Sequence, residues 1–144
     1  MILHATLVAL RLWGLWRGAL LTGASGAGKS DLALRALNEG FSLVADDRVS
    51  LWTSEGRLYG AAPEALRGLI EVRGVGIERV TPIPFAEIIL TVPLTDRVER
   101  MPEDTTQTLL NVGIPTRPLW PFEPAAPVKL RRLLESLGAG PQRA

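Results

Sequence analysis

Gly23-Ala24-Ser25-Gly26-Ala27-Gly28-Lys29-Ser30 is the stretch that decides the fold, because it fits the phosphate-binding pattern G-x-x-x-x-G-K-[ST] at every fixed position. Glycine permits the backbone to curl so that successive N–H groups point at phosphate oxygens. In this pattern the lysine reaches the β- and γ-phosphates and the serine hydroxyl binds Mg²⁺. The octapeptide therefore predicts a nucleotide-phosphate site in which Lys29 is the cation and Ser30 a metal ligand.

The residues on either side of this loop support the prediction. Gly18-Ala19-Leu20-Leu21-Thr22 is short, apolar and strand-like, and Asp31 to Leu37 has apolar positions at helical spacing. A strand, a loop and a helix in this order direct a helix N-terminus at the bound anion. The helix is expected to end near Asn38-Glu39-Gly40, because glycine suits a left-handed C-terminal cap.

Composition and charge narrow the function classes. The chain has 144 residues, of which 47% are hydrophobic and 22% charged, as in one soluble globular domain. The net charge of +1 shows no nucleic-acid-binding signature, and no apolar run is long enough to span a membrane. The absence of cysteine excludes disulfides, thiolate zinc sites and thiol catalysis. Because the N-terminus lacks a positively charged segment, we expect no cleaved signal peptide and a cytoplasmic enzyme.

The chain is expected to form a single domain over residues 1–144. Strands are predicted where apolar and β-branched residues concentrate, at 2–12, 18–22, 41–45, 49–53, 58–61, 69–73 and 87–92. Residues 11–18 are predicted to form a hairpin connection, with Gly14 and Gly18 in the turn.

Three further segments are predicted to differ from the strands. Residues 63–69 are predicted to form a short helix that has Pro63 near its start. Prolines recur from Pro93 onward, which predicts an extended or irregular segment on the outside of the domain. A C-terminal amphipathic helix is expected at about 127–137.

Two adjacent carboxylates, Asp46 and Asp47, end the apolar segment 41–45. In parallel α/β sheets the carboxyl ends of strands form the ligand crevice. One carboxylate there can hold Mg²⁺, directly or through water, and the other can accept the proton of an attacking hydroxyl. The alternative interpretation of the pair is a solvated turn.

The segment Ile70-Glu71-Val72-Arg73-Gly74-Val75-Gly76-Ile77 places Glu71 and Arg73 on one face of a strand, because side chains repeat every two residues. The glycines that follow permit close approach of a ligand, whereas the alternative is a surface ion pair. On composition alone, the single histidine, His4, is interpreted as a packing residue at a strand edge, and a catalytic role is the alternative.

Taken in chain order, these segments resemble the catalytic domain of HPr kinase/phosphorylase. The resemblance is carried by Ile2-Leu3-His4, Gly23 to Asp31, Leu43-Val44-Ala45-Asp46-Asp47-Arg48-Val49 and Ile70 to Ile77. The last segment is similar to the family's own signature and is more specific than the phosphate loop. The chain looks most like the short alphaproteobacterial form. The resemblance implies an α/β P-loop nucleotide-binding domain with a mixed central sheet flanked by helices, similar to that of PEP carboxykinase.

The resemblance also implies a reaction and roles for single residues. The family transfers phosphate from ATP to a serine of HPr, the phosphocarrier of the sugar phosphotransferase system. By position, Asp47 matches the general base and Asp46 would support metal or water beside it. Glu71 matches a metal-side carboxylate, His4 the upstream active-site histidine, and Arg100 a downstream arginine that stabilises the moving phosphoryl group.

The chain departs from longer relatives after residue 118. Leu119-Trp120-Pro121-Phe122 stands where they continue with glycine and a basic stretch tied to dephosphorylation. Kinase activity is therefore predicted without phosphorolysis of phosphoserine-HPr. A small-molecule P-loop kinase and a non-catalytic ATP-dependent partner-binding switch remain the alternatives. Long relatives form hexamers, and by analogy Trp13, Trp16 and Trp120 would suit a contact between subunits.

Overall fold

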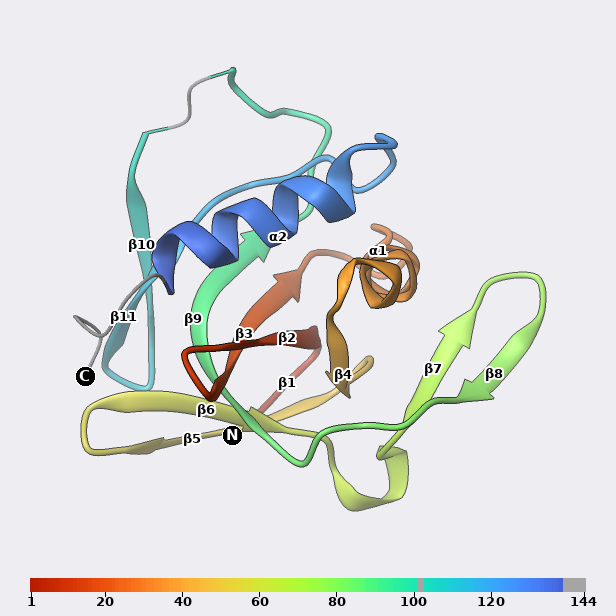
Figure 1. The fold of residues 1–144 in the computed structure, drawn as a ribbon, viewed down its shortest axis with the longest axis horizontal. Helices are drawn as coiled ribbons and strands as arrows, with labels where there is room; N and C mark the ends of the chain where they lie inside the picture. Colours follow the sequence, from red (N-terminus) through yellow and green to blue (C-terminus); the bar gives the residue numbers. More distant parts are fainter. Residues whose placement is uncertain (101–102, 139–144) are drawn as a thin grey trace.

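The structure is a computed structural model that describes residues 1–100 and 103–138 (Figure 1). Its large sheet consists of β1 (Ile2–Leu3), β2 (Thr6–Leu12), β3 (Leu15–Thr22), β4 (Ser42–Ala45), β5 (Val49–Ser54), β6 (Arg57–Ala61), β9 (Ala86–Pro93), β10 (Thr105–Leu109) and β11 (Val112–Thr116). The other elements are α1 (Lys29–Ala36), α2 (Ala126–Leu137), the 3-10 turns Leu37–Glu39 and Glu64–Leu66, and a separate hairpin of β7 (Leu69–Val72) and β8 (Gly76–Arg79).

The large sheet is mixed, as the family resemblance implies. Its strand order is β1-β5-β6-β9-β3-β2-β4, and the β10–β11 hairpin joins β9 through β11. The two strands at its centre, β3 and β9, are parallel, whereas β2 pairs antiparallel with both β3 and β4. The α/β fold class is therefore confirmed, and the strand before the phosphate loop lies at the centre of the sheet.

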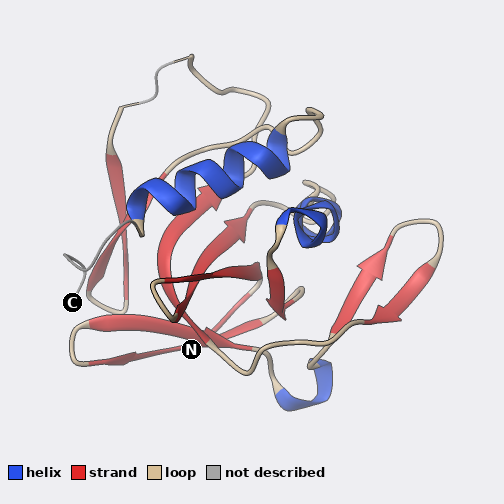
Figure 2. Ribbon diagram, in the orientation of Figure 1, coloured by secondary structure: helices blue, strands red, loops and turns tan. Residues whose placement is uncertain are grey.

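Both faces of the sheet centre are buried. On β2, Val8 and Leu10 belong to the core that contains both helices, whereas Leu7 and Ala9 belong to a second core made of strand and loop residues. Burial on both faces explains why this segment is almost continuously apolar instead of alternating. Figure 2 shows both long helices on one side of the sheet, while the β5–β6 hairpin curls under the other. The expectation of flanking helices thus holds for one face.

The first hairpin is tighter than predicted. The turn between β2 and β3 consists of Trp13 and Gly14, with φ of 54° and 77°, the left-handed geometry of a two-residue hairpin. The prediction that Gly18 lies in the turn is wrong, because Gly18 lies within β3. A Cβ there would come within 2.8 Å of Leu7 Cδ1, so glycine is needed where the sheet curls onto its own core.

Three other predictions require correction. The first strand is two strands, because the chain breaks at His4 and Ala5 and leaves its pairing with β5 for β3 and β4. The predicted helix 63–69 contains a single 3-10 turn. The segment after Pro93 contains the β10–β11 hairpin, in which Leu109 and Ile114 are buried. Within the described part of the chain, no helix is long and apolar enough to cross a lipid bilayer.

Candidate functional site

The phosphate loop follows β3 and owes its shape to its glycines. Gly23, Gly26 and Gly28 have φ of 146°, 83° and 99°, values that residues with a side chain rarely adopt. Gly28 is also the N-cap of α1, and its carbonyl accepts a hydrogen bond from Leu32 N at 2.9 Å. The loop therefore opens into the N-terminus of the helix, the geometry that binds anions.

Lys29 places its ammonium inside this loop. Its Nζ donates hydrogen bonds to the carbonyl oxygens of Gly23 at 2.6 Å and Ala24 at 3.0 Å. An ammonium group carries three protons, so Nζ can donate a further hydrogen bond to an anion. The side chain is largely buried and lines the same pocket as Ser25 and Ser30.

The two aspartates that follow β4 have opposite surroundings. Asp46 is only 6% exposed, whereas the side chain of Asp47 is 57% exposed. Asp47 has a φ of 72°, a left-handed conformation that aspartate tolerates better than most residues. Arg48 N donates to Asp46 O at 2.9 Å, which closes a tight turn between β4 and β5. The turn ends the strand with one carboxylate inside the protein and one at the surface.

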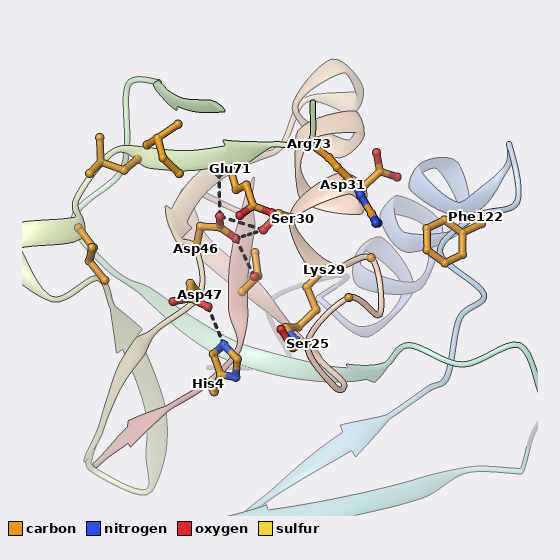
Figure 3. A pocket seen from close by; sticks show the side chains of 16 residues that line it. His4, Ser25, Lys29, Ser30, Asp31, Asp46, Asp47, Glu71, Arg73 and Phe122 are labelled. Atoms are coloured by element: carbon orange, nitrogen blue, oxygen red, sulfur yellow. Dashed lines mark hydrogen bonds and ion pairs between the residues drawn. The ribbon is translucent and has the colours of Figure 1, made fainter. Parts of the chain in front are cut away.

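The buried carboxylate of Asp46 connects four segments of the chain. Oδ1 accepts from Thr6 Oγ1 at 2.9 Å, and both oxygens accept from Ser30 Oγ, at 2.7 and 2.9 Å. Oδ2 also accepts from the main-chain N–H of Glu71 at 3.0 Å. Asp46 thus fixes the serine of the phosphate loop against β2 and the start of the β7–β8 hairpin (Figure 3).

The exposed carboxylate of Asp47 is paired with His4. The distance from His4 Nε2 to Asp47 Oδ1 is 2.6 Å, and both side chains are about half exposed. His4 reaches this position because it lies in the break between β1 and β2. The pair forms one side of the pocket, and the phosphate loop forms another (Figure 3).

These groups line one cavity of about 500 Å³. It brings together the predicted site residues Lys29, Ser30, His4, Asp46, Asp47 and Glu71, and from the rest of the predicted loop Ser25, Gly26 and Gly28. The predicted loop residues Gly23, Ala24 and Ala27 are not among the lining residues. The N–H of Ala27 donates a hydrogen bond to Ala24 O within the loop. Arg73 lines the cavity together with Glu71, as expected for side chains on one face of a strand.

Arg100 is not brought to this cavity. It lines a second cavity with Arg117 and Trp120, between the segment after β9 and α2. The active-site role of Arg100 therefore stays a prediction from the family resemblance. The sequence could not predict the position of Arg100, because this residue lies outside the helices and strands, between β9 and β10.

The residues of the cavity fit a phosphate chain with a divalent cation. Four carboxylates line it together with two basic side chains, Lys29 and Arg73; the carboxylates are Asp31, Asp46, Asp47 and Glu71. Within residues 1–100 and 103–138 there is no cluster of three His, Asp or Glu side chains able to hold a metal by itself. Mg²⁺ typically takes one or two carboxylates and completes its octahedron with water and substrate phosphates. This donor set fits that mode of binding.

Thr6 and Phe122 are among the cavity residues that were not predicted from the sequence as site residues. Thr6 is fully buried. A polar residue inside the apolar segment 5–10 is a sequence signal for a buried side chain with a hydrogen-bond partner. Phe122 also lines the cavity, although it lies far along the chain from the other lining residues. No local pattern indicates that contact.

Comparison with known proteins agrees with this geometry. The family model described as "HPr Serine kinase C-terminal domain" matches residues 1–91. A protein of Bordetella pertussis named HPr kinase/phosphorylase is 42% identical over 115 residues, which cover 69% of this chain and 36% of that protein. A protein of the same name from Pediococcus pentosaceus is 51% identical over 69 residues, 47% of this chain and 22% of that protein. The chain therefore spans about a third or less of the length of these relatives.

A solved structure gives the same result for the fold. The structure titled "Hpr(Ser) kinase/phosphatase from Coxiella burnetii" superposes with a TM-score of 0.78 at 25% sequence identity, and the match covers 94% of this chain and 89% of that one. The family match includes the phosphate loop, both aspartates and the β7–β8 hairpin. The chain belongs to the HPr serine kinase C-terminal domain family.

Proposed function

We propose that this protein is an ATP- and Mg²⁺-dependent kinase that phosphorylates a serine of an HPr-type phosphocarrier protein. The observation that carries the proposal is the arrangement of one cavity, with Lys29 and Ser30 on one side and the His4–Asp47 pair on another. Phosphoryl transfer needs groups that hold the phosphate donor next to a group that accepts the proton of the hydroxyl acceptor. Regulation of the phosphotransferase system, a cytoplasmic location and a homo-oligomer remain predictions.

The phosphate loop would hold the triphosphate. The N–H groups at the start of α1 and the ammonium of Lys29 favour the charge of the β- and γ-phosphates. Ser30 Oγ and the Glu71 carboxylate would be the protein ligands of Mg²⁺, and Asp46 would act through Ser30 or a bound water. When bound, the ion neutralises the charge of the phosphate oxygens.

Asp47 would be the general base. Its exposed carboxylate faces the cavity, where it can accept the proton of the serine hydroxyl as that oxygen attacks the terminal phosphorus and ADP departs with the bridging oxygen. His4, at 2.6 Å, orients the carboxylate and keeps one oxygen occupied. Positioning and electrostatic stabilisation would supply most of the rate, because phosphoryl transfer requires little covalent chemistry from the protein. Only the forward kinase reaction is proposed.

Mass spectrometry of an HPr-type protein tests the proposal after incubation with ATP, Mg²⁺ and this chain. The expected product is one phosphoserine. Asp47→Asn should reduce its formation by about 10²- to 10⁴-fold while ATP binding is retained. Asp104→Asn is the matched control, because Asp104 is an exposed aspartate outside the cavity and this variant should phosphorylate at the wild-type rate.

One result would overturn the role of Asp47, and two others would overturn the kinase assignment. If Asp47→Asn retains transfer, Asp47 is not the base. Phosphorylation of small acceptors but not of the protein would indicate a small-molecule kinase. ATP-dependent association with the partner, without any transfer, would indicate a binding switch.

A further inference from the structure

Phe122 lies at the edge of the cavity with an aromatic ring that the hydrophobic core does not use. The residue is 54% exposed, and its ring lines the same cavity as Lys29 and Asp31. A Cβ added to Gly28 would lie 3.0 Å from Phe122 Cζ. The ring therefore rests directly against the phosphate loop, at a position where the loop has no side chain.

The main chain on both sides of Phe122 is fixed to the helix that follows the loop. Arg35 of α1 donates hydrogen bonds to the carbonyl of Pro121 and, at 3.3 Å, to that of Glu123. Its Nε also donates to Asp31 Oδ2 at 3.1 Å. An exposed aromatic ring on a fixed backbone loses little conformational entropy when a ligand covers it.

The two sides of the loop indicate what covers the ring. Figure 3 shows His4 and Asp47 on one side of the phosphate loop and Phe122 on the other. If the terminal phosphate faces Asp47, the rest of the nucleotide leaves the loop in the opposite direction, over the N-terminus of α1. The Arg73 guanidinium lines this cavity as well and points toward the side of Phe122 in the same view.

We propose that the ring of Phe122 stacks on the heterocyclic base of the nucleoside triphosphate. This inference rests on the proposed nucleotide-binding function and adds a residue that recognises the base. Every base has a π-face, so stacking contributes affinity with little discrimination beyond a preference for the larger purines. Arg73 would add a planar cation to the same subsite.

Isothermal titration with two Mg²⁺-loaded ligands tests the inference: ATP, and inorganic tripolyphosphate, which has the phosphates but no base. Phe122→Ala should raise the Kd for ATP about tenfold, which corresponds to about 1.4 kcal/mol, because the stacking of the base on the ring is lost. Its Kd for tripolyphosphate should stay within about twofold of the wild-type value, and Phe122→Trp should retain ATP binding. Phe85→Ala is the control, because Phe85 is an exposed aromatic residue outside this cavity.

Two outcomes overturn the stacking. Wild-type affinity of Phe122→Ala for ATP would show that the base lies elsewhere. An equal loss of ATP and tripolyphosphate would show that the ring only supports Gly28. The kinase proposal fails separately: if the base-dependent loss occurs but the wild-type protein transfers no phosphate, the stacking stands and the kinase assignment falls. A wild-type protein that binds neither ligand overturns both.

Discussion

Removing the Asp46 carboxylate is expected to destabilise the fold because of the donors that it leaves behind. In Asp46→Ala, the Ser30 hydroxyl can turn toward the cavity. The Thr6 hydroxyl is fully buried and the Glu71 N–H is fixed in the main chain, so both lose their acceptor. Each unsatisfied group costs about 1–3 kcal/mol, and release of one buried charge offsets part of the loss. We expect the free energy of unfolding to fall by about 2–4 kcal/mol.

A second substitution separates this explanation from a general loss of packing. In the wild-type protein, Thr6→Val removes a hydrogen bond to a carboxylate and should cost about 1.5–3 kcal/mol. In the Asp46→Ala background the same change removes an orphaned hydroxyl and should stabilise the protein by about 1 kcal/mol. Thr6→Val therefore reverses the sign of its effect, and the double-mutant cycle gives the coupling energy of the pair.

Urea unfolding with linear extrapolation measures all four proteins of the cycle. Asp47→Asn serves as the control, since its exposed carboxylate should contribute no more than about 0.5 kcal/mol. The reasoning is refuted if Thr6→Val destabilises both backgrounds equally, or if Asp47→Asn costs as much as Asp46→Ala.

Three other predictions concern packing, catalysis and the Phe122 segment. Gly60→Ala should lower the free energy of unfolding by about 1–3 kcal/mol, because the added Cβ would lie 2.7 Å from Leu7 Cδ2, whereas Gly113→Ala, with open space around it, should be neutral in the same urea experiment. His4→Ala should change stability by less than about 1 kcal/mol yet slow phosphoserine formation, measured as an initial rate at saturating ATP. Arg35→Met should cost about 1–3 kcal/mol in thermal or urea unfolding, since two carbonyls lose their donor; an unchanged midpoint would contradict the anchoring role.

The phosphate loop could be predicted from the sequence because every interaction that shapes it is local. Glycines at 23, 26 and 28 and the following helix act within a few residues of each other. The contact of His4 with Asp47 is different, since it joins residues 43 positions apart. It depends on the break between β1 and β2, which composition does not indicate, and only the family resemblance pointed to His4.

The second half of the chain was harder to predict for a physical reason. Repeated prolines indicate irregular structure, because proline lacks the N–H that a strand ladder needs. Pro115 nevertheless lies in β11, at the margin of the sheet, where β11 pairs with β9 through a single residue pair. Burial of Leu109 and Ile114 against the second core holds this hairpin in place, and that core comes from strands far away in the sequence.

The Asp46–Asp47 turn shows how backbone geometry and chemistry constrain the same residues. The tight turn after β4 keeps the Asp46 carboxylate buried and leaves that of Asp47 exposed, so two consecutive residues serve two different roles. The left-handed φ of 72° at Asp47 belongs to the turn that leads into β5 and favours Asp, Asn or Gly there. Alanine at this position would remove the carboxylate and strain the backbone at once. Asparagine removes only the charge, which is why it isolates the chemical role of Asp47.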